Sequence, residues 1–221
     1  MTDEASLRRE EDALKIRAGI AAVLLLAVFT APAFAQEGVS GGVKVGVGFA
    51  NLSSDDEDFD SLDTRTGVVV GGFANVPVGE RLSVVIEALF TQKGAKEVFE
   101  DDSEVTIKLD YIEVPILFNV GFDTMTTVQP FVYAGVAPAF NTSAKVVEEF
   151  GDGEEDEVDI DDDVKAFDVG LVFGGGVRFG IFAVEGRYTL GLVNVNDDAD
   201  VDESVKNRQA AILFSVMFGP R

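Results

Sequence analysis

The sequence predicts an all-β protein, an eight-stranded antiparallel up-and-down transmembrane β-barrel. Three observations favour this fold. An export leader precedes about eight strand-like segments, bulky apolar side chains alternate with small or polar ones along these segments, and acidic runs separate them in a regular rhythm. No stretch after Ala35 is apolar enough for a transmembrane helix, so strands are the elements left to cross the bilayer.

The first 35 residues have the features of a secretory signal peptide. Residues 18–30 form an uncharged apolar run that follows Lys15 and Arg17, and a small-x-small pattern ends at Ala35. The run is too short to span a bilayer, and no stop-transfer pattern follows, which disfavours the alternative of an uncleaved anchor. We therefore expect cleavage after Ala35, a mature barrel domain over residues 36–221, and export to the outer membrane.

Eight segments have the length of a tilted strand that crosses a bilayer, about ten residues. The alternation is clearest in the last three segments. In residues 166–179, for example, Phe167 and Leu171 share one face, and Asp168 and Gly170 share the other. The predicted strands are residues 41–50, 64–76, 81–93, 105–121, 128–142, 166–179, 181–193 and 208–218.

The connections between these segments alternate in length. Those after the second, fourth and sixth segments are short, whereas the others are longer and mostly acidic, as in residues 53–63, 148–163 and 196–204. Short turns at one end and long polar loops at the other are typical of outer-membrane barrels, and an even strand number places both termini at the periplasmic end. A soluble barrel would hide its large apolar residues inside, so the bulky Phe, Leu and Val set favours the membrane barrel.

Two prolines fall inside predicted strands. Pro115 and Pro138 have no N–H group to donate to a strand ladder, so we expect a local bulge at each. The sequence has no Trp, and any aromatic girdle at the membrane surface would have to come from its 18 Phe and 3 Tyr.

The composition argues against several function classes. A net charge of −23 disfavours nucleic acid, which needs a basic surface. The absence of His and Cys removes the commonest general base, the commonest zinc ligand and any disulfide framework. Catalysis by an activated nucleophile would have no base, so we expect neither an enzyme nor a cofactor.

Charged residues from six segments fall on the predicted inner face. An eight-stranded barrel is just wide enough for side chains to fill it, and a buried charge must be paired. We expect an ion-pair network that plugs the lumen, with a charged gate or proton path as the alternative. Glu113 and Glu185 should face the lumen and pair with arginines such as Arg178 or Arg187. The predicted network is Lys44, Arg65, Glu87, Glu113, Asp168, Arg178, Glu185 and Arg187.

The acidic loops carry carboxylates, the oxygen ligands that Ca²⁺ prefers. A calcium-loop pattern fails over residues 194–205, where Ala199 stands in place of the turn glycine and Val205 in place of the bidentate glutamate. Solvated, self-repelling loops are therefore the first expectation, and weak contact with divalent cations is the alternative.

Two adjacent segments resemble a known family. Residues 108–122 read KLDYIEVPILFNVGF, and residues 129–140 read QPFVYAGVAPAF. They resemble the hallmark strands of the outer membrane β-barrel protein family, also described as porin family or PorT-like, which is similar in architecture to OmpA/OmpX-type small barrels. In that family a Tyr-x-Glu-x-Pro strand precedes a strand with an aromatic residue and a glycine. The matching residues here are Tyr111, Glu113, Pro115, Tyr133 and Gly135.

The resemblance implies a location and a fold more than an activity. It implies outer-membrane lipid and, during biogenesis, the barrel-assembly machinery as partners. The expected role is structural, adhesive or envelope-stabilising. The alternatives are a narrow channel for ions or small solutes, and a surface binding module that uses the acidic extracellular loops. A general diffusion porin is not expected, because porins with an aqueous channel use about 16–18 strands.

Overall fold

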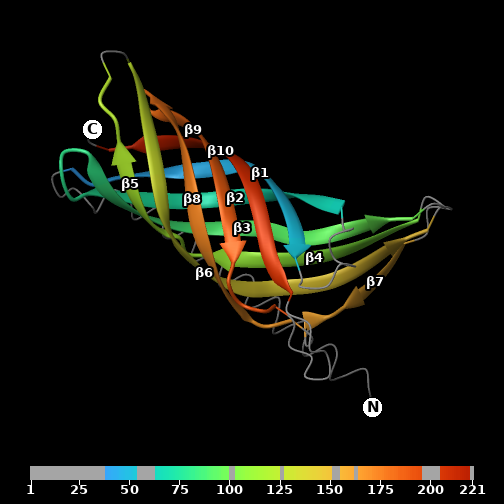
Figure 1. Cartoon of the computed structure of the whole chain (residues 1–221). Helices are drawn as coiled ribbons and strands as arrows, with labels where there is room; N and C mark the ends of the chain where they lie inside the picture. Colours follow the sequence, from blue (N-terminus) through green and yellow to red (C-terminus); the bar gives the residue numbers. More distant parts are fainter. Residues whose placement is uncertain are drawn as a thin grey trace.

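The computed structural model describes residues 38–53, 63–99, 103–124, 127–150, 155–161, 164–195 and 205–219. The predicted signal peptide and its cleavage site lie outside these residues. Within them, ten strands form one antiparallel sheet (Figure 1). The strands are β1 (Ser40–Ser53), β2 (Asp63–Pro77), β3 (Leu82–Val98), β4 (Glu104–Glu113), β5 (Ile116–Gly121), β6 (Val128–Glu149), β7 (Glu155–Asp159), β8 (Phe167–Phe179), β9 (Phe182–Gly191) and β10 (Lys206–Phe218).

The sheet closes into a ring of eight strand positions. Around the ring, β1 is followed by β10, β9, β8 and β6, then by β4 together with β5, then by β3 and β2, which pairs back to β1. β4 and β5 form one position because both pair with β3 on one side and with β6 on the other. The predicted eight-stranded antiparallel barrel is confirmed, and each predicted strand coincides with one position of the ring.

The short connections gather at one end of the ring. The β2–β3 turn is tied by hydrogen bonds from the backbone N–H groups of Val78 and Gly79 to the carbonyl of Leu82. The β8–β9 turn passes through Gly180, whose φ of +63° lies in the left-handed region that favours glycine. We call this the turn end of the barrel and the opposite end the loop end.

Pro115 breaks the fourth strand position, as expected for a residue without an N–H group. β4 ends at Glu113 and β5 begins at Ile116. The ladder is interrupted at Pro115, but its register is the same on both sides of the interruption, and no register shift occurs at Pro138. The bulges predicted at both prolines are therefore wrong. The Pro138 carbonyl accepts a hydrogen bond from the backbone N–H of Val114, beside the break between β4 and β5. The nitrogen of Pro138 faces the same side, where the ladder is already interrupted, so its lack of an N–H group costs no further hydrogen bond. The irregularity between β4 and β6 lies instead between Asp110 and Tyr111.

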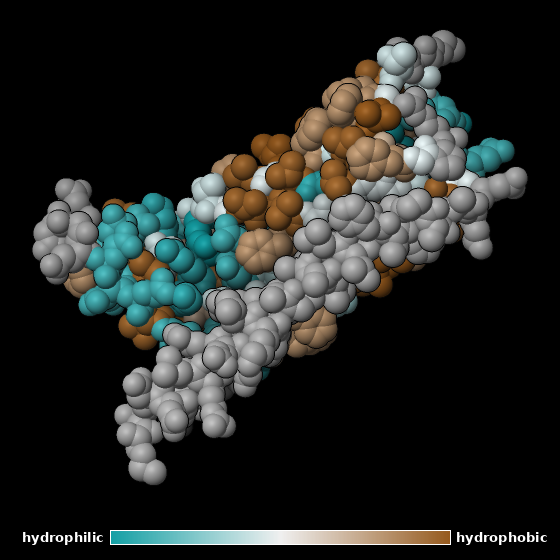
Figure 2. Space-filling view, turned by 180° about the vertical axis from the view of Figure 1, so that it is seen from behind, coloured by the Kyte–Doolittle hydropathy of each residue, from teal (hydrophilic) through white to brown (hydrophobic). Residues whose placement is uncertain are grey.

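Side chains alternate between the barrel interior and its outer surface. On β10, Leu213 and Ser215 are buried, whereas Ile212 and Phe214 are exposed. Similar exposed Val, Ile, Leu and Phe side chains occur on the other ring positions and form an apolar belt around the middle of the molecule (Figure 2). The belt has the character of a lipid-facing surface. None of the described residues forms a helix long and apolar enough to cross a bilayer.

Four strands continue beyond the belt at the loop end. β3, β4, β6 and β7 project as a sheet past the other strands (Figure 1), and we call residues 94–98, 104–109, 144–149 and 155–159 the tongue. β7 was not predicted, because its sequence EDEVD is typical of a solvated loop. It becomes a strand by pairing with the outer edge of β6, from Lys145 to Glu149.

Candidate functional site

The barrel interior holds most of the predicted lumen charges. Arg178 is half-buried, whereas the other seven are buried: Lys44, Arg65, Glu87, Glu113, Asp168, Glu185 and Arg187. The polar side chains inside form two groups. An apolar cluster of Val69, Leu89, Ala211 and Leu213, from β2, β3 and β10, packs beside them.

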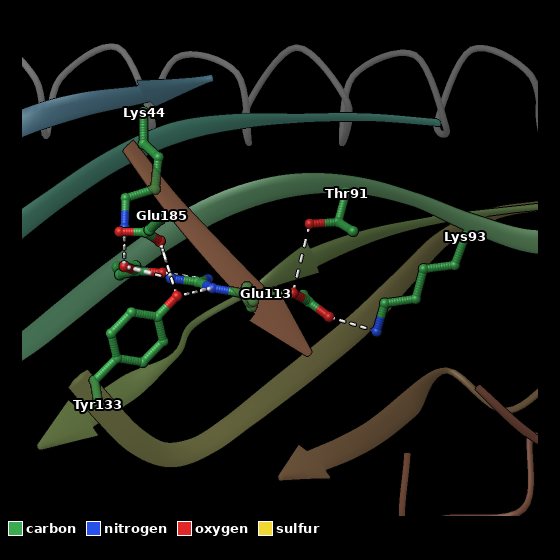
Figure 3. Close-up of polar contacts among 8 residues, drawn as sticks. Lys44, Thr91, Lys93, Glu113, Tyr133 and Glu185 are labelled. Carbon is green, nitrogen blue, oxygen red and sulfur yellow. Dashed lines mark hydrogen bonds and ion pairs between the residues drawn. The ribbon is translucent and has the colours of Figure 1, made fainter. Parts of the chain in front are cut away.

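The turn-end cluster consists of Lys44, Glu87, Tyr133, Glu185 and Arg187 (Figure 3). Lys44 Nζ lies 2.6 Å from Glu87 Oε1 and 2.8 Å from Glu185 Oε1. Arg187 donates to both carboxylate oxygens of Glu87, at 2.6 and 2.9 Å, and its Nη2 lies 3.0 Å from Glu185. Tyr133 donates from its hydroxyl to Glu185 at 3.0 Å and accepts from Arg187 Nε at 3.1 Å. Two cations and two anions therefore balance each other.

These contacts cross the barrel along two diameters. β3 and β9 are separated by three positions on the β1 side of the ring, so they lie opposite each other. The bidentate pair between Glu87 and Arg187 thus spans the lumen. β1 and β6 also lie opposite each other, and Lys44 and Tyr133 reach Glu185 from these two sides. In a barrel of this width, such pairs fill the cross-section.

The loop-end cluster is built around Glu113. Lys93 Nζ lies 2.5 Å from its Oε1, and Thr91 donates to its Oε2 at 3.4 Å (Figure 3). The Lys93 ammonium also lies 5.2 Å from the ring centroid of Tyr111, within range of a cation–π interaction. Glu113 was expected to pair with an arginine, and that expectation is wrong, because the nearest cation across the strand pair is Lys93.

A second contact of this cluster crosses the lumen. Asn207 of β10 donates to the Tyr111 hydroxyl at 3.2 Å and to Asp168 Oδ2 at 3.1 Å. β4 and β10 are opposite positions in the ring. Asp168 is thus held by an amide within the described residues rather than by an arginine.

Five of these side chains were absent from the predicted charge network, although two of them, Tyr111 and Tyr133, belong to the family motif; the other three are Thr91, Lys93 and Asn207. Lys93 falls on the same strand face as Glu87, so strict period-2 counting along β3 would have found it. Tyr133 and Asn207 carry no charge, and selection by charge alone passed over them. They supply the hydrogen bonds that link the ion pairs to the opposite wall.

Two predicted residues lie apart from both clusters. Arg178 makes no ion pair within the described residues, and its guanidinium carbon lies 5.7 Å from the ring centroid of Phe131 near the turn end. The pairing of Glu185 with Arg178 is therefore not seen, whereas its pairing with Arg187 is. Arg65 sits where the β2–β3 register shifts between Thr64 and Val69, and its Nη1 donates to the backbone carbonyl of Lys93.

The family motif supplies interior and wall residues. Tyr111 and Glu113 lie in the loop-end cluster, Tyr133 lies in the turn-end cluster, and Pro115 makes the strand break. A Cβ on Gly135 would lie 2.0 Å from the backbone oxygen of Ile116. The β5 and β6 backbones therefore approach too closely at this point for any side chain.

The space left inside the turn end is small. A cavity of about 30 Å³ borders Lys44, Tyr133, Arg178 and Glu185, enough for a water molecule. Among the described residues, no group of three or more His, Cys, Asp or Glu side chains is arranged to hold a metal ion. Much of the acidic loops 53–63 and 196–204 lies outside those residues.

Comparison with known proteins identifies the family. The model of the outer membrane protein beta-barrel domain matches residues 34–197, well over half of the chain. This chain belongs to that family. The predicted resemblance is therefore confirmed, and the protein is an outer-membrane β-barrel. A search of curated protein sequences finds no match.

Solved structures of other small barrels resemble the chain in fold. Neisserial surface protein A is 16% identical, with a TM-score of 0.48, and the match covers 82% of this chain and 100% of that one. Ail, the attachment invasion locus protein of Yersinia pestis, is 12% identical in its complex with a heparin analogue, with a TM-score of 0.39 and coverage of 81% and 99%. The outer membrane enzyme PagL is 11% identical, with a TM-score of 0.44 and coverage of 78% and 98%.

Proposed function

We propose that this protein is a non-catalytic structural barrel of the outer membrane, with a sealed interior and a rigid wall that carries the tongue and the acidic surface loops. Its role in the envelope is stabilising or adhesive. The observation that carries this proposal is the Glu87–Arg187 pair, which joins opposite walls through two short hydrogen bonds. A transport protein would need this cross-section to be open.

Two polar contacts between opposite walls support a sealed interior. The Glu87–Arg187 pair joins β3 to β9, and the hydrogen bond from Asn207 to Tyr111 joins β10 to β4. An ion passing through would have to part buried ion pairs, which is unfavourable in a low-dielectric interior. The buried carboxylates all have partners within the described residues. Glu87, Glu113 and Glu185 bind lysine or arginine, and Asp168 accepts from Asn207.

Planar-bilayer recording tests the sealed interior. The wild-type monomer should give only small or intermittent conductance, because its lumen is filled by side chains. A double variant, Glu87→Ala with Arg187→Ala, removes one diametric contact without leaving either charge alone, and its conductance events should be larger and longer. Steady, large conductance from the wild-type monomer would mean that the interior is open and that the protein is a channel.

We also propose that residues 1–35 are a signal peptide removed after Ala35. The uncharged run over residues 18–30 and the small residues Ala33 and Ala35 support this assignment. N-terminal sequencing of the protein from outer-membrane fractions should give Gln36 as the first residue. Recovery of residues 1–35 on the membrane-bound protein would overturn it.

A further inference from the structure

We propose that the inner face of the tongue, the side that continues the barrel interior, binds a cationic amphipathic helix of another protein. The tongue projects past the other strands at the loop end (Figure 1). Its inner face carries exposed apolar side chains among carboxylates that have no cation beside them. This assignment rests on the adhesive role proposed above, for which it names the chemistry of the partner.

The alternation along β4 defines the inner face. Leu109 and Tyr111 are buried in the loop-end core. Val105 and Ile107 occupy the alternate positions nearer the tip, so they point to the same side of the sheet. Ile107 also packs against that core. The inner face therefore continues without a break from the barrel interior toward the tip of the tongue.

An apolar row crosses this face at the height of Ile107. The ladder partners of Ile107 are Ala95 on β3 and Val146 on β6, and Val146 pairs in turn with Val158 on β7. Residues directly opposite each other in a ladder share a face of the sheet. Val158 is 58% exposed, so the outer part of the row is open to solvent.

Two phenylalanines extend the apolar surface to the tip. The N–H group of Phe99 donates to the Ser103 carbonyl at 2.9 Å, so the pairing of β3 with β4 continues one residue beyond β3. Alternation places Phe99 on the face of Ala95, and it places Phe150, at the end of β6, on the face of Val146. Both rings are exposed. Exposed apolar side chains with a polar rim mark an interaction site.

The charges on this face are all negative toward the tip. The ladder partners of Val105 are Glu97 on β3 and Glu148 on β6, and Glu148 stands opposite Asp156 on β7. Like charges directly opposite each other destabilise a sheet. Within the described residues, none of these three carboxylates has a lysine or arginine at ion-pair distance. The lysines of the tongue occupy the alternate positions, on the outer face: Lys96, Lys108 and Lys145.

The dimensions of the face fit one helix. Four strands at a spacing of about 4.8 Å give a width of about 14 Å, and the rows from Phe99 to Ala95 span about 13 Å along the strands. A helix with its side chains is about 10–12 Å in diameter. Its apolar stripe would cover Val105, and lysines on its two flanks would reach Glu97 and Glu148, which lie on either side of Val105.

Fluorescence anisotropy with the full mature protein in phosphatidylcholine nanodiscs tests this assignment. The probe is a labelled peptide of about 14 residues with leucine on one face of the helix and lysine on the other. Wild-type protein should bind it more strongly than empty nanodiscs do. Glu148→Lys should weaken binding about fivefold, which corresponds to the ~1 kcal/mol of an exposed ion pair. Phe99→Ser combined with Phe150→Ser should weaken it about tenfold, the scale of an aromatic anchor at an interface.

The matched controls lie one residue away, on the outer face. Glu149→Lys makes the same change of charge at an exposed position of the same strand, and Val98→Ser removes an exposed apolar side chain. Each should bind the peptide within about twofold of the wild type, because solvent and salt screen a charge on the far face.

Peptide binding no stronger than that of empty nanodiscs would overturn the choice of partner. Equal losses in Glu148→Lys and Glu149→Lys would overturn the inner face, because net charge alone would then attract the peptide. Conductance is measured separately in planar bilayers, so a failure of peptide binding is distinguishable from an open interior.

Discussion

Glu87→Ala is expected to lower the free energy of unfolding by about 3–5 kcal/mol, because it leaves buried cations without their anion. Glu87 is 1% exposed and accepts hydrogen bonds from Lys44 and from both terminal nitrogens of Arg187. Both cations would keep only Glu185 as a carboxylate partner. Reversible urea unfolding in lipid vesicles, followed by the migration of the folded barrel on gels, measures the loss.

The matched control is Glu80→Ala, which removes a carboxylate from the exposed turn between β2 and β3. Its effect should be within about 0.5 kcal/mol, as for most surface substitutions. A Glu87→Ala loss below about 1 kcal/mol, the scale of exposed ion pairs, would show that water reaches the cluster and hydrates the charges. The sealed interior would then be wrong as well.

Tyr111→Ala is expected to cost about 3–5 kcal/mol, the range for truncating a buried large aromatic side chain. The Tyr111 ring is fully buried, packs in the loop-end core with Leu109 and Ala139, and lies beneath the Lys93 ammonium. The substitution also frees the Asn207 amide from its contact across the lumen.

Tyr111→Phe separates the ring from the hydroxyl. It keeps the packing and removes only the hydrogen bond from Asn207, so it should cost about 1 kcal/mol in the same unfolding assay. If Tyr111→Phe cost as much as Tyr111→Ala, the hydroxyl and not the ring would hold the two walls together, and the packing argument would fail.

The strands and their faces could be predicted from the sequence because period 2 carries that information directly. The alternation of Ile212, Leu213, Phe214 and Ser215 is sufficient to assign β10 to the wall and to tell its lipid face from its lumen face. The burial of Glu87 and Arg187 follows from the same rule applied to β3 and β9.

The partners inside the lumen could not be predicted in the same way. Period 2 indicates that Glu113 points inward, but its contact with Lys93 depends on the register between β3 and β4, which the alternation within one strand does not give. Arg65 lies outside both clusters because the β2–β3 register shifts between Thr64 and Val69. Gly67 lies in that interval, but a single glycine does not give the position of a bulge. β7 could not be predicted because it forms only by pairing with the open edge of β6. That edge exists in the assembled sheet and cannot be seen in the five residues of β7.

The diametric ion pairs also make the order of assembly matter. Glu87 and Arg187 are 100 residues apart in the chain, and Lys44 and Glu185 are 141 apart. A partial barrel built from the first strands would hold Lys44 and Glu87 before β9 arrives with Arg187 and Glu185. Contacts of such long range are slow to form, because the loop between them must close first. Until the last strands insert, the growing interior holds an incomplete set of charges and must stay wet, so dehydration of the lumen and closure of the ring become a single late step.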